Sequence, residues 1–442
     1  MKRTLKYLYL SLALLVILPD TFSQSVYGLK ECIGIGLERN FSLLIARNYE
    51  SIASNNYTPG NAGYLPSLGL NSSYSGSLTD TRQKMTDGST NVSNGVNNTT
   101  SANSVSLGWT LFNGFNVRTT YKKLGELKNQ GKLNTRLSAE NLVSQIISGY
   151  YNYIQQIQLL NNLKYACTLS KERLRIDEDR YLLGSGSKLE VLQSRVYLNA
   201  DSSNLSKQSE VVRTAQVKLN ELMAADDIGA SFMTRDTSIL VNPDLLYDNL
   251  LDETLKENTS LLIAASNQTL SEYDYKIISS RTYPYLNLSS GYSYNMYNYS
   301  SSSTKSSTVK GMNYGLTLGF NLFDGFTQRR NIRNATIDKD NKVLLYQQLE
   351  QGIRADLITI FNTYSNNLRL ITLEKQNLST ASENLDIALE RYKLGSLSGI
   401  DLREVQKSLL DAKESLLVIQ YQAKIAEISL MLISGRIMEY YR

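Results

Sequence analysis

Two long stretches of the chain carry apolar side chains at alternating intervals of three and four residues. From 343 to 392 nearly every position of this spacing is aliphatic or aromatic, and the spacing resumes from 402 to 433. It is the signature of a coiled-coil seam, along which one helix packs against another. The stretches 116–183 and 327–394 have no Pro and only scattered Gly. We predict long helices over both, each about 100 Å long at about 1.5 Å per residue.

The seam of the stretch that follows residue 188 is less regular. Every seventh position is apolar, but the positions between them are Ser194, Asp201 and Gln208. The helical period therefore continues with polar side chains inside it.

Four shorter stretches alternate with a period of two, which indicates strands. They are 66–78, 104–112, 284–297 and 312–323. On each, one face is apolar or aromatic and the other is small and polar, so we predict two β-hairpins, 66–112 and 284–323. A soluble sandwich would show the same alternation. Lengths of about ten residues, with aromatic side chains near the strand ends, favour the wall of a transmembrane barrel.

The segments between the paired strands, 79–103 and 298–311, are rich in Ser, Thr, Asn and Gly. We expect them to be exposed extracellular loops. A leading helix is predicted over 25–58, and Pro66 and Pro284 mark the points where a helix gives way to a strand.

A turn motif occurs twice. RYLLGSGSKLE at 180–190 is matched by RYKLGSLSGID at 391–401, and LFNGF at 111–115 is matched by LFDGF at 322–326. In each turn motif a Gly ends one helix, a Ser can cap the next, and an acid follows in its first turn. The chain is therefore predicted to be two copies of one unit, each a helix, β-hairpin, long helix, tight tip and return helix.

These copies set the predicted domain boundaries. In chain order they are the first copy (24–225, tip 184–190), an equatorial linker with short β-like runs at 231–233 and 239–241 (226–248), the second copy (249–435, tip 395–401) and a C-terminal tail (436–442).

Residues 1–23 indicate a secretory signal peptide. Basic side chains at 2, 3 and 6 precede the apolar run 8–18, and Thr21-Phe22-Ser23 supplies a small-residue cleavage site. The mature protein is expected to leave the cytoplasm. No later stretch holds the roughly 18–20 continuous apolar residues of a membrane-spanning helix, so a membrane span must be a β-barrel.

Composition narrows the chemistry. A formal net charge of +5 over 442 residues is too mild to indicate nucleic-acid binding. The chain has no His and only two cysteines, Cys32 and Cys167, which excludes zinc sites and His-based acid–base catalysis. Two buried thiols are favoured for these cysteines, with a disulfide as the alternative.

The run GSGSK at 184–188 does not predict a phosphate-binding loop, because it lacks the Walker spacing and the preceding strand. No constellation of catalytic groups is found elsewhere. We therefore predict a protein that is not an enzyme and takes no cofactor or metal.

With these elements in order, the chain resembles the TolC family of outer-membrane efflux channels. The resemblance rests on the two-fold repeat, the LFxGF motifs and the pattern R-Y-x-x-G-S-x-S-x-x-[DE] at both tips. It implies an α+β membrane protein, a homotrimer whose four strands per chain make one twelve-stranded outer-membrane β-barrel, continued into the periplasm by an α-helical barrel of coiled coils. Four strands are also too few to close a barrel alone, since the smallest use about eight.

The family's function would make this protein the passive exit duct of a tripartite efflux pump or a type I secretion system, exporting small molecules or proteins. An inner-membrane transporter would supply the energy, a periplasmic adaptor (membrane fusion) protein would dock on the tips, and outer-membrane lipid would surround the barrel. The expected docking residues are Gly184, Ser185, Ser187, Gly395, Ser396 and Ser398. The alternative is a trimeric coiled-coil surface protein without transport, which would need neither two tips at one end nor strand pairs between helices.

The resemblance also implies a gate at the tips. In the family a Tyr and an Arg before the second tip's acid hold the closed tip through an acid of the first tip, and acidic rings narrow the pore. Tyr392 matches that Tyr and Glu190 the first-tip acid, while Asp401 and Glu404 match the ring positions. Leu397 occupies the Arg position, a departure from the family. The alternative role for these acids is to start helices, where the dipole favours a carboxylate.

Overall fold

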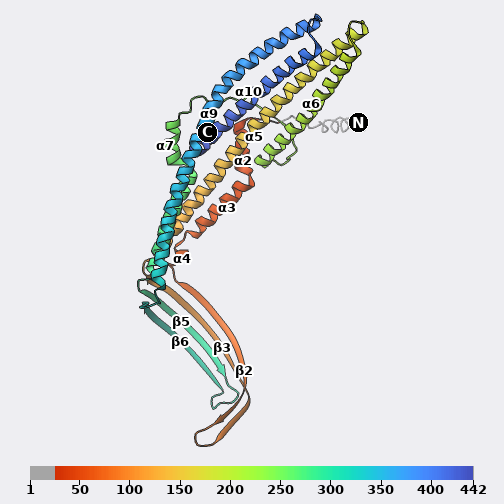
Figure 1. Ribbon diagram of the computed structural model, residues 1–442. Helices are drawn as coiled ribbons and strands as arrows, with labels where there is room; N and C mark the ends of the chain where they lie inside the picture. The colour runs from red at the N-terminus through yellow and green to blue at the C-terminus, as the bar shows by residue number, and fades with distance from the viewer. Residues whose placement is uncertain (1–24, 442) are drawn as a thin grey trace, which may run out of the picture. The chain divides into compact units, whose positions relative to one another are not determined.

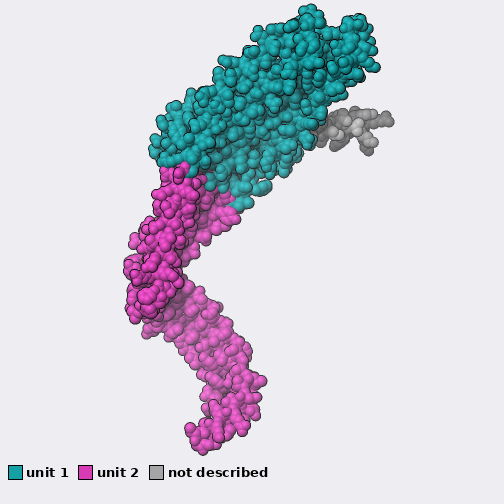
Figure 2. Space-filling view, in the orientation of Figure 1, with its two compact units in different colours: residues 1–45, 137–258, 352–442 teal, residues 46–136, 259–351 magenta. Residues whose placement is uncertain are grey.

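The computed structural model describes residues 25–441, and these divide into two compact units, each described by itself (Figure 2). Unit 1 comprises residues 1–45, 137–258 and 352–442, and unit 2 comprises residues 46–136 and 259–351. The predicted signal peptide, 1–23, lies outside the described residues.

A four-stranded antiparallel sheet in unit 2 contains both predicted hairpins. Its strands are β2 (Ser67–Lys84), β3 (Thr90–Asn113), β5 (Tyr285–Asn298) and β6 (Ser306–Gly319), in the order β2-β3-β5-β6 (Figure 1). The register aligns their period-two patterns. One row across the sheet is Leu70, Val105, Tyr292 and Met312, and the neighbouring row is Gly69, Ser106, Gly291 and Asn313. Adjacent rows point to opposite faces, so the sheet has one apolar face and one small, polar face.

The strands extend into both segments predicted as loops, 79–103 and 298–311. Only 85–89 and 299–305 lie outside the strands, and β6 stops at Gly319, short of its predicted end. The two loop predictions were wrong because they followed side-chain polarity. The hydrogen bonds of a β-ladder are made by the backbone, and they form equally well between segments rich in Ser, Thr and Asn.

The leading helix predicted over 25–58 is broken into β1 (Ser25–Tyr27), α2 (Leu29–Arg39) and α3 (Phe41–Asn56), followed by the short α4 (Pro59–Ala62). The break falls at Asn40, whose Oδ1 accepts hydrogen bonds from the N–H groups of Ser42 and Leu43 at 3.0 and 3.3 Å. Asn competes in this way with continuation of a helix. A similar break falls at Asn258, between α7 (Tyr247–Glu257) and α8 (Thr259–Ser280).

The predicted long helices are confirmed. They are α5 (Asn116–Leu182), α6 (Lys188–Met223), α9 (Thr327–Lys393) and α10 (Gly399–Ile433), with tight turns after α5 and α9 (Figure 1). In unit 1 their seams enclose an apolar core that includes Val143, Ile146 and Leu219, all fully buried. Cys32 and Cys167 are free, buried thiols, and burial raises the pKa of Cys32 to about 12.

Helix α10 is the one described helix that is long and apolar enough, by composition alone, to cross a membrane. Its apolar side chains are used within unit 1, where Leu402, Leu409 and Leu430 are buried. The helix also carries a buried ion pair, between Lys424 and Glu427, at 2.8 Å.

The linker 226–248 is held to the surrounding elements by several contacts, including a strand pairing and a shared carboxylate. Its strand β4 (Phe232–Thr234) pairs in parallel with β1, whereas the β-like run 239–241 forms no strand. Glu427 of α10 accepts hydrogen bonds from the N–H of Asn242 at 3.0 Å and from the hydroxyl of Tyr440 at 2.5 Å. Tyr440 belongs to η1 (Ile437–Tyr440), so the linker and the C-terminal segment are held to the same carboxylate.

Candidate functional site

The two tips share one backbone design. Gly184 and Gly395 take the left-handed conformation, each with φ of 75°. The next residue, Ser185 or Ser396, donates hydrogen bonds from both N–H and Oγ to the carbonyl of the Arg five positions earlier, at 2.9–3.3 Å. Gly suits this helix-ending position because it has no Cβ to clash there.

The helices that leave the tips are capped by the predicted serines. Ser187 Oγ accepts a hydrogen bond from the N–H of Glu190 at 3.2 Å, while Glu190 Oε2 accepts one from the N–H of Ser187 at 2.8 Å. This reciprocal pair is a capping box. Ser398 Oγ accepts from the N–H of Asp401 at 3.2 Å and donates to its carboxylate at 2.7 Å. Both acids therefore serve the start of their own helix.

Large apolar side chains flank these small turns. Leu182, Leu183 and Leu394 are 81%, 82% and 82% exposed. Contiguous exposed apolar surface marks sites of interaction with other proteins. Each tip thus offers a small-residue turn beside apolar side chains.

We refer to the helical pair α5 and α6 as the first hairpin and to the pair α9 and α10 as the second. Tyr392 of α9 joins the second hairpin to the first through Asp177 of α5. Its hydroxyl donates to Asp177 Oδ1, and the Arg180 guanidinium lies 4.7 Å from the centroid of its buried ring. Burial, together with the hydrogen bond to Asp177, raises the pKa of Tyr392 to about 12. The hydroxyl therefore remains a donor at physiological pH. The expected link between Tyr392 and Glu190 is replaced by this contact with a different acid.

A second link runs between α6 and α10. Arg403 donates from Nη1 and Nη2 to the two carboxylate oxygens of Asp201, both at 2.8 Å. This bidentate geometry gives a strong, directional ion pair. The side chain of Asp201 is 5% exposed and that of Arg403 23%. The ring of Tyr197 contacts two guanidinium groups, with Arg403 Cζ at 5.1 Å and Arg173 Cζ at 5.0 Å from its centroid.

Asp177 and Asp201 each accept a hydrogen bond from a serine on the other helix of the first hairpin. Ser194 of α6 donates to Asp177 of α5, and Ser170 of α5 donates to Asp201 of α6. Arg173 is 3% exposed and approaches Asp177 at 3.8 Å, but its Nε and Nη1 make no hydrogen bond. A buried polar group that is only partly satisfied makes the surrounding contacts sensitive to any change in charge.

We refer to Arg173, Asp177, Asp201, Tyr392 and Arg403 as the tip cluster. Of its members, only Tyr392 was expected to be functional. The polar interruptions of the first seam, at positions 194 and 201, were the sequence signal for it. That signal showed where polar groups enter the seam but not which partners they meet.

Asp401 and Glu404 are exposed on α10 and take no part in the tip cluster. Being three positions apart, they lie on one side of the helix. Among the described residues, no basic side chain forms an ion pair with either carboxylate. Both are therefore open to solvent in the single chain.

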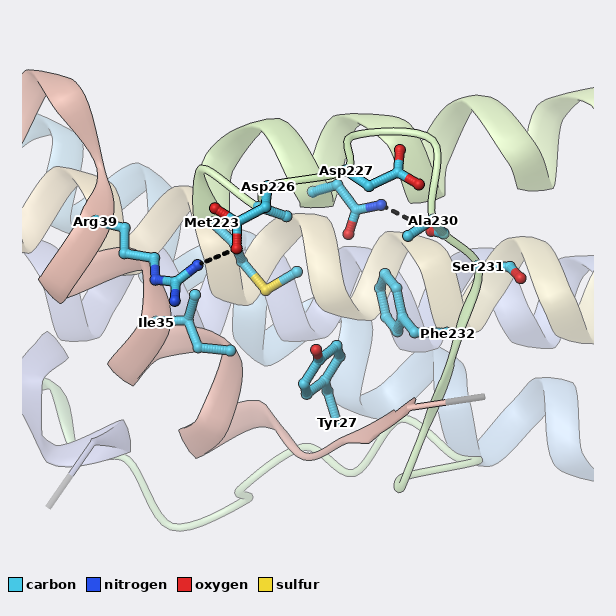
Figure 3. Close-up of a pocket in the computed structure, with 11 residues that line it drawn as sticks. Tyr27, Ile35, Arg39, Met223, Asp226, Asp227, Ala230, Ser231 and Phe232 are labelled. Carbon is cyan, nitrogen blue, oxygen red and sulfur yellow. Dashed lines mark hydrogen bonds and ion pairs between the residues drawn. The ribbon is translucent and has the colours of Figure 1, made fainter. Parts of the chain in front are cut away.

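A cavity of about 320 Å³ lies beside the linker in unit 1 (Figure 3). Its wall includes Tyr27 and Phe232, whose rings meet edge-on at 5.4 Å, and Arg39, which forms an ion pair with Asp226 at 2.9 Å. Over residues 25–441 no group of three or more His, Cys, Asp or Glu side chains is placed to hold a metal ion. This arrangement fits a structural role, holding the linker against α2.

Comparison with known proteins gives concordant results. The profile of the family described as "Outer membrane efflux protein" matches residues 33–225 and 250–436. Outer membrane protein TolC of Salmonella enteritidis is 22% identical over 361 residues, which cover 78% of this chain and 71% of that protein. Among solved structures, the CmeC outer membrane channel of Campylobacter jejuni has a TM-score of 0.77 at 19% identity, covering 92% of this chain and 85% of that one. VceC of Vibrio cholerae has a TM-score of 0.75 at 17% identity, covering 92% and 96%.

Proposed function

The chain belongs to the outer membrane efflux protein family, whose members are non-enzymatic outer-membrane channels with a helical periplasmic part, and we propose that three copies form the passive exit duct of a tripartite efflux pump or type I secretion system. Family membership also sets aside the alternative of a surface protein without transport.

The proposed trimer rests on the four-stranded sheet, which has one apolar face, one polar face and two outer strands with unpaired edges. β2 and β6 are the outer strands of the order β2-β3-β5-β6, so each has one edge without a partner in the single chain. In lipid every backbone N–H and C=O must be paired. The edge strands would therefore pair with those of other copies and close a barrel. Three copies would give twelve strands, with the apolar face toward lipid and the small, polar face toward the lumen.

We therefore expect the detergent-extracted protein to be a trimer with strong helical circular dichroism. Leu316→Pro in the edge strand β6 should abolish trimers, because Pro lacks the N–H that the ladder needs. Ser302→Pro, in the loop after β5, is the matched control and should assemble normally. Size-exclusion chromatography with light scattering measures both. A monodisperse monomer that is soluble without detergent would contradict the barrel.

The tips are the proposed docking surface for a periplasmic adaptor, which would connect the channel to an inner-membrane transporter. Gly184, Ser185 and Ser187 in the first tip and Gly395, Ser396 and Ser398 in the second are small residues that allow close approach of a partner helix. The exposed leucines beside them supply apolar contact area.

We further propose that the tip cluster, including Tyr392, holds the hairpins in the closed state, and that Glu190 contributes by capping the first return helix. Two links between the hairpins support this role. Tyr392 connects α9 to α5 and Arg403 connects α10 to α6, so separating the hairpins requires breaking both.

Asp401 and Glu404 are proposed as the pore constriction. Three chains would place rings of carboxylates at the periplasmic mouth, and such rings attract and select cations. We expect Asp401→Asn with Glu404→Gln to reduce cation preference and to weaken block by a trivalent cation in planar bilayers. Asp411→Asn with Glu414→Gln removes the same charge further from the tip and should change neither. Unchanged block in the first variant would leave the two acids as helix-start carboxylates.

A further inference from the structure

Two phenylalanines at equivalent places in the two copies have a left-handed backbone. Phe115 has φ of 67° and Phe326 of 64°, and each follows a left-handed glycine, Gly114 or Gly325. A side chain with a β-carbon rarely adopts this conformation, and for a bulky aromatic residue it is an outlier. Among residues 25–441 the only other non-glycine residue with positive φ is Ala224.

The two residues precede the longest helices of the chain. The carbonyl of Phe115 accepts a hydrogen bond from the N–H of Thr119, and that of Phe326 from the N–H of Arg330, both at 3.0 Å. The position before a helix usually holds Ser, Thr, Asp, Asn or Gly, and Asn and Gly adopt positive φ most readily. The turn itself therefore does not require Phe, and the aromatic ring must supply something else.

Both residues are more than half exposed in the described chain, although the Phe115 ring also meets that of Tyr283 edge-on at 6.5 Å. Phe115 is 58% exposed and Phe326 65%. Each meets the earlier phenylalanine of its LFxGF motif edge-on, at 5.3 Å for Phe112 and 5.4 Å for Phe323. These contacts orient the rings but leave most of their surface open.

The first ring continues the apolar face of the sheet. A shift in register after Thr110 brings Phe112 opposite Leu286, which in turn pairs with Leu318. Phe112, Leu286 and Leu318 thus form the last apolar row at this end of the sheet. Because Phe115 contacts Phe112, its ring extends that face one step beyond the strands. In the second copy Phe323 is itself 72% exposed beside Phe326.

We propose that Phe115 and Phe326 insert into the headgroup region of the periplasm-facing leaflet and fix the depth of the protein in the outer membrane. This inference rests on the proposed barrel, since the continuation of a lipid-facing surface is itself a lipid contact. Aromatic rings gather at the membrane–water interface and border the apolar band of β-barrels. The left-handed backbone is the means by which a residue outside the strands turns its ring toward lipid.

Tryptophan fluorescence tests this directly, because the chain has one Trp, Trp109, on the apolar face opposite Leu288. Phe115→Trp and Phe326→Trp are introduced separately on a Trp109→Phe background and reconstituted into phospholipid vesicles brominated near the headgroup or near the chain end. We expect loss of fluorescence for both reporters with bromine near the headgroup and little loss with bromine at the chain end. Tyr181→Trp on the same background, at the tip, should not be quenched in either vesicle.

The proposal is overturned if bromine does not quench the two reporters. Quenching by acrylamide would then place the rings in water, and no quenching by acrylamide would place them against a neighbouring copy. The unsubstituted protein separates this result from failure of the barrel. If Trp109 is quenched by brominated lipid and the reporters are not, only the anchor inference fails. If Trp109 is also unquenched, the barrel fails.

Phe115→Asn with Phe326→Asn supplies a second measurement. Asn tolerates the left-handed backbone, so the unfolding temperature in detergent should stay the same or rise, while the bromine depth profile of Trp109 shifts. A lower unfolding temperature with an unchanged Trp109 profile would assign the two rings to packing and overturn the proposal.

Discussion

Gly395→Trp is expected to abolish export while leaving trimers in the outer membrane. No described atom lies within 4 Å of the place where a side chain on Gly395 would begin, so an indole there projects from the tip without disturbing the helices behind it. If an adaptor packs closely on this turn, the indole blocks it. Export of a toxic substrate is measured by growth in its presence, and trimer content by gel electrophoresis of membranes.

The control for this substitution separates bulk from backbone strain. Gly395 has φ of 75°, which costs an L residue about 1–2 kcal/mol. Gly395→Asn tolerates the same backbone with a small side chain, so it should export normally. Leu394→Asp, which removes apolar surface without changing Gly395, should weaken export. Full export by the Trp variant at normal membrane levels would remove this turn from the docking surface.

Asp201→Asn is expected to open the channel at rest. The substitution removes the partner of a bidentate ion pair in which Asp201 is nearly buried, and Arg403 would keep its charge without that partner, against the Tyr197 ring that Arg173 also contacts. Breaking a buried pair costs about 3–5 kcal/mol, and partial exposure of Arg403 places the effect near about 3 kcal/mol, roughly a hundredfold shift toward separated hairpins. Single-channel conductance in planar bilayers should rise, and cells should become sensitive to a large hydrophilic antibiotic.

An exposed ion pair within the first hairpin provides the comparison. Glu178 and Arg195 pair at 2.9 Å between α5 and α6, but their side chains are 43% and 56% exposed. Exposed pairs contribute about 0–1 kcal/mol, so Glu178→Gln should leave conductance unchanged. Tyr392→Phe, which breaks the other link, should add to the effect of Asp201→Asn. Resting conductance equal to that of the unsubstituted protein in the combined variant would remove the tip cluster from the gate.

Most of the fold could be predicted because its elements follow from local periodicity. The three-four spacing identifies α9 and α10, and the absence of Pro with only scattered Gly identifies α5. The period of two identifies the four strands, and Gly with a following Ser identifies the tips. The loops 79–103 and 298–311 were misassigned because side-chain polarity says little about backbone pairing. The leading helix was extended through Asn40, where a single side-chain cap outweighs a continuing apolar pattern.

The sequence by itself determined the periodic elements, the two matching tips and the capping serines, since each depends on residues a few positions apart. Only the tertiary structure decided that Tyr392 meets Asp177 and that Arg403 meets Asp201. The heptad pattern indicates that a side chain faces the seam. It does not indicate which residue of another helix lies at the same level along the helix axis. Each residue advances a helix by about 1.5 Å, so one turn of axial slippage would exchange every cross-hairpin partner. That register is fixed by the packing of the whole seam, whereas Glu190, which is proposed for the gate, caps its own helix through Ser187, only three positions away.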